Sequence, residues 1–284
     1  MAHASWPFPL GSLSDLPTIP SMAGLALAVA EDPDATASDL LRVIMSDPPI
    51  AAKVLRVANS VYFQRGGGEV TDLQTAIVRL GFANVRNILM GVSVIRSFNA
   101  FFVGAPYTRE DFWIHSISVG VLASRLSGAN ESLCSSTAFV VGLMHDLGKL
   151  LFDRHARASW VRALAVSRER KIPLCEAERE TLGADHAALA GALLEAWRFP
   201  RELSEPVRWH HDPRTCSEEH RLHAMLLHVA DAVCSARRIG YSGNDHPAPP
   251  SRESLESLEV TARGLEEAVA SLEGEPLMRL LLPV

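Results

Sequence analysis

The stretch Ala138-Phe139-Val140-Val141-Gly142-Leu143-Met144-His145-Asp146-Leu147-Gly148-Lys149 is the most informative part of this chain. An imidazole and a carboxylate stand side by side directly after an apolar run that is expected to be buried, and burial of both without partners would be costly. A divalent cation would remove that cost, because imidazole nitrogen and carboxylate oxygen are common metal ligands. Short motifs also match by chance, so the alternative for this pair alone is an inert, hydrogen-bonded His-Asp pair at a helix end.

Further histidines and aspartates occur in segments with helical, apolar surroundings. With His145 and Asp146, the candidate ligands are His115, His186, His210, His211 and Asp231. Seven candidates exceed what one ion requires, so two ions per chain are expected. Nitrogen and oxygen donors without a thiolate suit Fe, Mn, Zn, Co or Ni, and the sequence does not choose among these metals.

The front half of the chain carries several spaced motifs of its own. They are Leu16-Pro17-Thr18-Ile19-Pro20, Ile44-Met45-Ser46-Asp47-Pro48-Pro49, Val54-Leu55-Arg56-Val57-Ala58-Asn59-Ser60 and Leu73-Gln74-Thr75-Ala76-Ile77-Val78-Arg79-Leu80-Gly81. Glu180-Thr181-Leu182-Gly183-Ala184-Asp185-His186 and Trp197-Arg198-Phe199-Pro200 follow later. Together these motifs resemble the HDOD family, a signalling branch of the HD superfamily that also contains the metal-dependent HD phosphohydrolases. The resemblance runs from about Leu13 to about Ile239.

The resemblance implies a layout for the metal site. The order of the candidates is the ligand order of the HD superfamily, and the paired histidines are similar to the binuclear sites of HD-GYP phosphodiesterases. On that pattern His115, His145 and Asp231 hold one ion, and His186, His210 and His211 hold the other. We assign Asp146 as the bridge, because a carboxylate has two oxygens with several lone pairs.

Asp146 and Lys149 are the candidate catalytic residues. Two metals about 3.5–4 Å apart could activate a bridging hydroxide and polarise a phosphoryl oxygen. Lys149 would lie one helical turn from Asp146 and could hold a phosphate as a point charge. The alternative for Lys149 is a lysine on a helix surface. No other cofactor is expected.

The resemblance leaves two functions open. Many HDOD members have lost part of the metal constellation and serve as non-catalytic signalling modules, whereas this chain keeps a candidate at every ligand position. It lacks the Gly-Tyr-Pro signature of HD-GYP enzymes and reads Asp212-Pro213-Arg214-Thr215-Cys216 after His211. The favoured function is a regulatory module with signalling protein partners. The alternative is a phosphohydrolase or phosphodiesterase that acts on a nucleotide or a cyclic dinucleotide.

Composition limits the class of protein. The 284 residues are 48% hydrophobic, enough for a sizeable core. The net charge of −6, without a long basic run, argues against nucleic acid as a partner. The four cysteines form no C-x-x-C pair, no signal peptide is visible, and the apolar runs are too short to span a bilayer. We therefore expect a cytoplasmic protein without membrane contact.

Helical periodicity nearly throughout, without alternating strand-like runs, predicts an all-α multi-helix fold. Ser38 and Asp72 are candidate N-caps, Asp47-Pro48 separates two helices, and Gly81 is placed to end one. We expect an N-terminal helical subdomain over residues 1–109 and an HD-like metal-site subdomain over residues 110–239. Residues 240–284 are expected to be a linker and an amphipathic helix from Ser254 to Leu272.

Overall fold

The computed structural model describes residues 17–32, 34–59, 68–98, 102, 106–130 and 132–272, and every regular element in these residues is a helix. The all-α prediction is therefore confirmed. In chain order the helices are α1 (Ser21–Glu31), α2 (Ala37–Met45), α3 (Pro48–Ala58), α4 (Leu73–Leu80), α5 (Phe82–Phe98), α6 (Arg109–Leu126), the short 3-10 helix η3 (Ser127–Ala129), α7 (Ser135–Met144), α8 (Leu147–His155), α9 (Arg157–Arg170), α10 (Leu174–Leu182), α11 (His186–Ala196), α12 (Arg201–Trp209), the 3-10 helix η4 (Pro213–Thr215), α13 (Arg221–Ala236), α14 (Arg252–Ser257) and α15 (Ala262–Ala270).

Local capping explains several helix ends in the front half. The Asp72 side chain accepts a hydrogen bond of 2.7 Å from the Thr75 N–H, and Gly81 ends α4 with a φ of +85° that favours glycine. Asp47-Pro48 separates α2 from α3 as expected, and the Asp47 side chain caps α3. The expected cap at Ser38 is wrong, because Thr36 caps α2 in a reciprocal capping box with Asp39.

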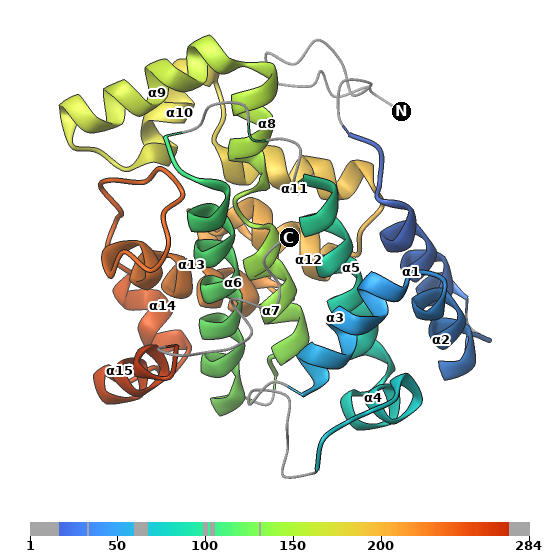
Figure 1. Cartoon of the computed structure of the whole chain (residues 1–284). Helices are drawn as coiled ribbons and strands as arrows, with labels where there is room; N and C mark the ends of the chain where they lie inside the picture. Colours follow the sequence, from blue (N-terminus) through green and yellow to red (C-terminus); the bar gives the residue numbers. More distant parts are fainter. Residues whose placement is uncertain are drawn as a thin grey trace.

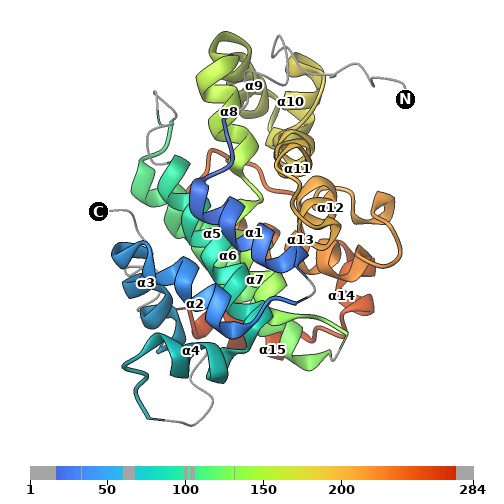
Figure 2. The ribbon, with the colours of Figure 1, turned by 90° about the vertical axis from the view of Figure 1, so that its right-hand side faces the viewer.

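The middle of the molecule is formed by α6 and α7, which run side by side between the N-terminal helices and α13 (Figure 1, Figure 2). The two helices approach closely at glycines. A Cβ atom on Gly142 would lie only 2.3 Å from the Cα atom of Gly120. This approach brings the end of α7 close to α6, the helix that carries His115, and α5 packs on the other side of α7.

The C-terminal region differs from the single amphipathic helix that we expected. The chain forms two short helices, α14 and α15, separated at Leu258–Thr261. Glu259 adopts a left-handed φ of +54°, and the Val260 N–H donates back to the Leu255 carbonyl. Thr261 then caps α15 through the Gly264 N–H. These backbone turns stop one helix and begin another, a feature that the charge pattern did not reveal. The subdomain boundaries at residues 109 and 239 stay predictions.

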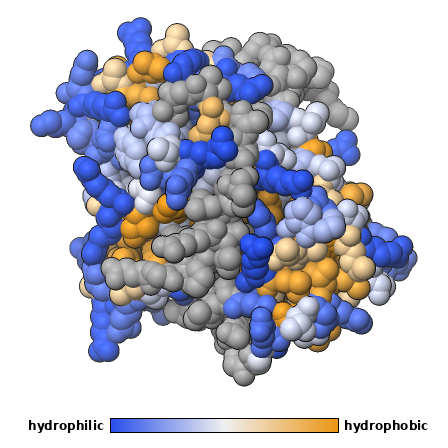
Figure 3. All heavy atoms as spheres, in the orientation of Figure 1, coloured by the Kyte–Doolittle hydropathy of each residue, from blue (hydrophilic) through white to orange (hydrophobic). Residues whose placement is uncertain are grey.

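The visible surface is mostly hydrophilic, with apolar areas that include one over the N-terminal helices on the right of the view (Figure 3). Leu25, Met45 and Val78, on α1, α2 and α4, are large exposed hydrophobic side chains. Among the described residues, no single helix is both long and apolar enough to cross a bilayer, and only the sharply bent pair of α4 and α5 meets that test jointly.

Candidate metal centre

The His145-Asp146 pair lies in the turn that joins α7 to α8, rather than inside one helix. The Nδ1 atom of His145 faces the Gly142 carbonyl at 2.8 Å, so this nitrogen carries the proton. The Nε2 atom is left to face the Asp146 carboxylate at 3.3 Å. The backbone of the helix end thus fixes the tautomer that a metal ligand needs.

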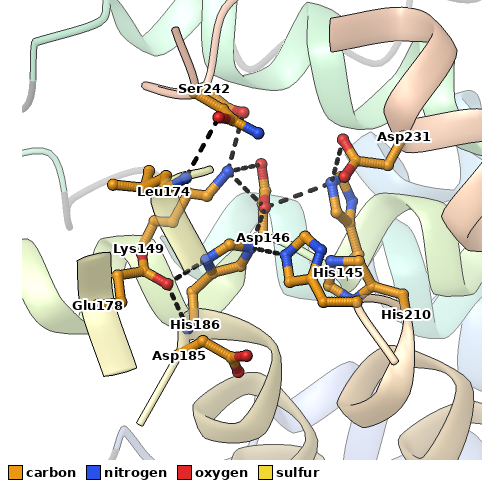
Figure 4. Close-up of polar contacts among 12 residues, drawn as sticks. His145, Asp146, Lys149, Leu174, Glu178, Asp185, His186, His210, Asp231 and Ser242 are labelled. Carbon is orange, nitrogen blue, oxygen red and sulfur yellow. Dashed lines mark hydrogen bonds and ion pairs between the residues drawn. The ribbon is translucent and has the colours of Figure 1, made fainter. Parts of the chain in front are cut away.

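Asp146 lies between a lysine and several imidazoles (Figure 4). The Lys149 ammonium donates to its carboxylate at 2.8 Å and to the Ser242 hydroxyl at 3.1 Å. Lys149 is only 2% exposed, so the alternative of a helix-surface lysine is wrong. Its charge is already partnered within the protein, by Asp146 and Ser242.

One side of the cluster comes from α6 and α13. The Nε2 atom of His115 lies 3.1 Å from Asp231 and 3.7 Å from Asp146. The Nε2 atom of His145 lies 3.7 Å from the same Asp231 oxygen. The Ser235 hydroxyl, one turn along α13, donates to Asp231 at 3.1 Å and holds that carboxylate in place.

The other side comes from the start of α11 and the end of α12. The Nε2 atom of His186 lies 3.2 Å from Asp146 and 2.9 Å from the Nε2 atom of His211. The Nδ1 atom of His210 bonds the Val207 carbonyl at 2.7 Å, so its Nε2 atom is also left for the cluster. Helix ends therefore aim these rings inward, as at His145.

The structure brings all seven predicted ligands together, although they come from five separate segments. Three groups have ligand atoms within 4.8 Å of one another: His115, His145 and Asp146; His145, His210 and Asp231; His186, His210 and His211. The third group coincides with a ligand set that the resemblance implies. The first group fits that layout with Asp146 as the bridge, whereas the second group joins His210 to His145 and Asp231.

Two ring nitrogens of the cluster are available to bind a cation. The Nε2 atoms of His145 and His210 are buried and hydrogen-bond to none of the described residues. An orphaned buried polar atom is costly unless something else binds it. Nitrogen and oxygen donors, without a thiolate, suit a divalent transition metal. The His/Asp groups thus indicate a divalent-metal site.

The electrostatics point the same way. Burial opposes charging of the His145 imidazole, yet the Asp146 and Asp231 carboxylates outweigh it and raise its pKa to about 10. Burial likewise opposes ionisation of Asp146, but His145 and Lys149 hold the pKa of that carboxyl well below its usual range. Burial and the charge at His145 lower the pKa of His210 well below its usual range. The carboxylates therefore retain a cation at the place where a metal would bind, and without a metal a proton takes that role.

Among the described residues, segment 240–250 lines two small cavities that reach the cluster. A cavity of about 170 Å³ has His115, Arg238 and Ser242 in its wall. A second, of about 20 Å³, reaches His211 and Asp231 beneath Asn244 and Pro247. The second has room for about one water molecule.

Two site residues were missed by the sequence reasoning. Glu178 is fully buried and bonds His186, and Ser242 bonds Lys149. Glu178 had a weak signal, an acidic residue among the buried positions of α10 eight residues before a candidate ligand. Ser242 had none, because it lies in a segment that reads as an exposed linker. Two of the other histidines, His223 and His228, bond backbone groups and stay outside the cluster.

A model of the HDOD domain matches residues 16–213 of the chain. The chain belongs to the HDOD family. Among solved structures, this HDOD chain is similar to an HDOD domain protein of unknown function from Geobacter sulfurreducens, with a TM-score of 0.72, 21% identity, and coverage of 94% of this chain and 92% of the other. A candidate phosphohydrolase from Shewanella amazonensis SB2B has a TM-score of 0.72 at 22% identity, with 95% and 96% covered. At these identities the likeness shows the fold alone.

Two curated relatives are much longer than this chain. An uncharacterised protein of Treponema pallidum is 24% identical over 210 residues, which cover 74% of this chain and 40% of that protein. Ribonuclease Y of Thermus thermophilus is 26% identical over 169 residues, 60% of this chain and 24% of the enzyme. The HDOD chain thus spans less than half the length of these relatives.

Proposed function

We propose that this HDOD chain is a signal-transduction module with a binuclear metal site of regulatory or structural role. The single observation that carries the proposal is the closure of the site. Segment 240–250 lies against the ligands, and of the two cavities that the described residues form there the larger is about 170 Å³. Pockets for drug-sized ligands are about 300–1,000 Å³, so a nucleotide or cyclic dinucleotide exceeds the room in that cavity.

The state of Lys149 supports the same proposal. A lysine that binds a substrate phosphate presents its ammonium to the pocket, whereas here Asp146 and Ser242 take its hydrogen bonds. Residues that would hold the ions are His115, His145, Asp146, His186, His210, His211 and Asp231. A divalent ion bound there would supply Lewis acidity and lower the pKa of a bound water.

Partner recognition is the other half of the proposed role. We expect signalling proteins to bind the N-terminal helices, where Leu25, Met45 and Val78 expose apolar side chains. Apolar residues in the centre of a patch are typical of protein interfaces.

Metal-dependent phosphohydrolysis is the second candidate, and one observation favours it. His115 and the exposed Arg238 line the same cavity, so an anion of phosphate size could approach the ligand cluster. Hydrolysis of a larger phosphodiester would then require segment 240–250 to move.

Metal analysis and an activity assay separate the two. Protein purified without chelator is expected to carry about two transition-metal ions per chain. With Mn²⁺, Fe²⁺ or Zn²⁺ added, it is expected to hydrolyse neither bis(p-nitrophenyl) phosphate nor a cyclic dinucleotide. Metal-dependent hydrolysis that Asp146→Ala abolishes would establish the enzyme instead. A metal-free wild type would remove the metal site from both functions.

A further inference from the structure

Glu178 is a buried carboxylate directly behind His186, outside the set of proposed ligands. It lies on α10, which ends at Leu182 and is capped by Gly183 before the chain turns into α11 with His186 as its first residue. The Oε2 atom of Glu178 accepts the His186 backbone N–H at 2.9 Å and the ring Nδ1–H at 2.6 Å (Figure 4). A carboxylate only accepts, so the ring proton lies on Nδ1 and the Nε2 lone pair faces the cluster.

The three ligand groups differ in the charge that they offer an ion. Two of the groups contain a carboxylate: Asp146 in the group with His115, and Asp231 in the group with His210. The third group, His186, His210 and His211, consists of imidazoles alone, and we call it the all-histidine position. Apart from the shared Asp146, nothing in this group offsets the charge of a buried divalent ion, and such a charge is costly without compensation.

We propose that Glu178 is a positioning residue that supplies negative charge to the all-histidine position through His186. A carboxylate on the far nitrogen of a ligating histidine fixes the ring and makes it a stronger donor. Removal of such a partner lowers metal affinity by about 10–100-fold. The inference rests on the proposed metal site and adds that its two ions depend on Glu178 unequally.

The test uses Mn²⁺ binding followed by calorimetry and by electron paramagnetic resonance of the bound ions. Glu178→Gln keeps the shape and an acceptor oxygen but removes the charge. It is expected to bind one Mn²⁺ as the wild type does and the other about 10–100-fold more weakly. The spectrum should change from that of a coupled Mn²⁺ pair to that of a single ion. Glu178→Asp keeps the charge and is expected to lie between Gln and wild type.

Glu180→Gln is the matched control. It lies on the same helix, pairs with Arg170 and is exposed, so it is expected to bind both ions like the wild type. Unchanged affinities in Glu178→Gln, or equal weakening of both ions, would overturn the inference while leaving the metal site standing. Absence of Mn²⁺ binding in the wild type and in the control would overturn the proposed function and the inference with it. If circular dichroism shows that the Gln variant is unfolded, the Asp variant decides: weakening confined to one ion supports the role, and any other pattern refutes it.

Discussion

Removal of the Asp146 carboxylate is expected to destabilise the metal-free protein, because Lys149 is buried against it. Lys149 is 2% exposed, and its ammonium lies 2.8 Å from Asp146 with the Ser242 hydroxyl at 3.1 Å as its other partner. Breaking a buried ion pair by deleting one member costs about 3–5 kcal/mol, since the remaining charge is left without compensation. Asp146→Ala should therefore lower the free energy of unfolding by about 3–5 kcal/mol in the presence of EDTA.

Urea unfolding followed by circular dichroism measures this loss, and a second variant isolates its cause. Asp146→Ala combined with Lys149→Met removes both charges, and replacement of both members of a buried pair by apolar groups is often neutral. The double variant is expected to recover most of the lost stability. The difference from additivity in this double-mutant cycle is the coupling between the two residues.

Metal binding supplies the second readout. Neither variant is expected to retain the two ions of the wild type, because Asp146 is the proposed bridge. The wild type should gain stability from excess Mn²⁺, by about 2.7 kcal/mol for each bound ion at a free concentration 100 times its dissociation constant. A single variant as stable as the wild type in EDTA would refute the reasoning on Lys149. Full metal content in Asp146→Ala would refute the bridging role.

Two further predictions test the surroundings of the cluster. Gly148→Ala would place a Cβ atom 2.1 Å from the His186 carbonyl oxygen, so it should lower the free energy of unfolding by about 1–3 kcal/mol and weaken Mn²⁺ binding. Gly128→Ala, with open space around it, is the control and should change that free energy by less than about 0.5 kcal/mol. Equal stability of the two variants would contradict the close approach. In EDTA, the raised pKa of His145, about 10 against an ordinary value of 6.5, contributes stability that is complete below pH 6.5 and is lost as pH rises toward 10. Denaturant unfolding from about pH 6 to about pH 10 should show this fall, while Mn²⁺ affinity rises because the metal displaces the proton; a Mn²⁺ affinity that is independent of pH would argue against His145 as a ligand.

The helical class and the identity of the ligand candidates followed from the sequence alone. Helical periodicity is a local property, and so are caps such as Asp72 and stops such as Gly81, because each depends on residues within one turn. The ligand candidates could be identified because imidazoles and carboxylates stand out in apolar helices, where their burial requires a partner. The helical pattern did not reveal that α7 ends at Met144, so that His145 and Asp146 lie in a turn before α8.

Only the tertiary structure decided how those residues meet. Lys149 and Ser242 are 93 positions apart, and no local pattern predicts that a breaker-rich segment folds back over the site. The same holds for Glu178, whose contact with His186 depends on the turn after α10. The grouping of the ligands, with Asp231 between His115 and His145, depends on how α6, α7 and α13 pack. Sequence periodicity specifies which face of a helix is buried, whereas distances between side chains of different helices are set by packing of the whole core, including contacts at glycines such as Gly142.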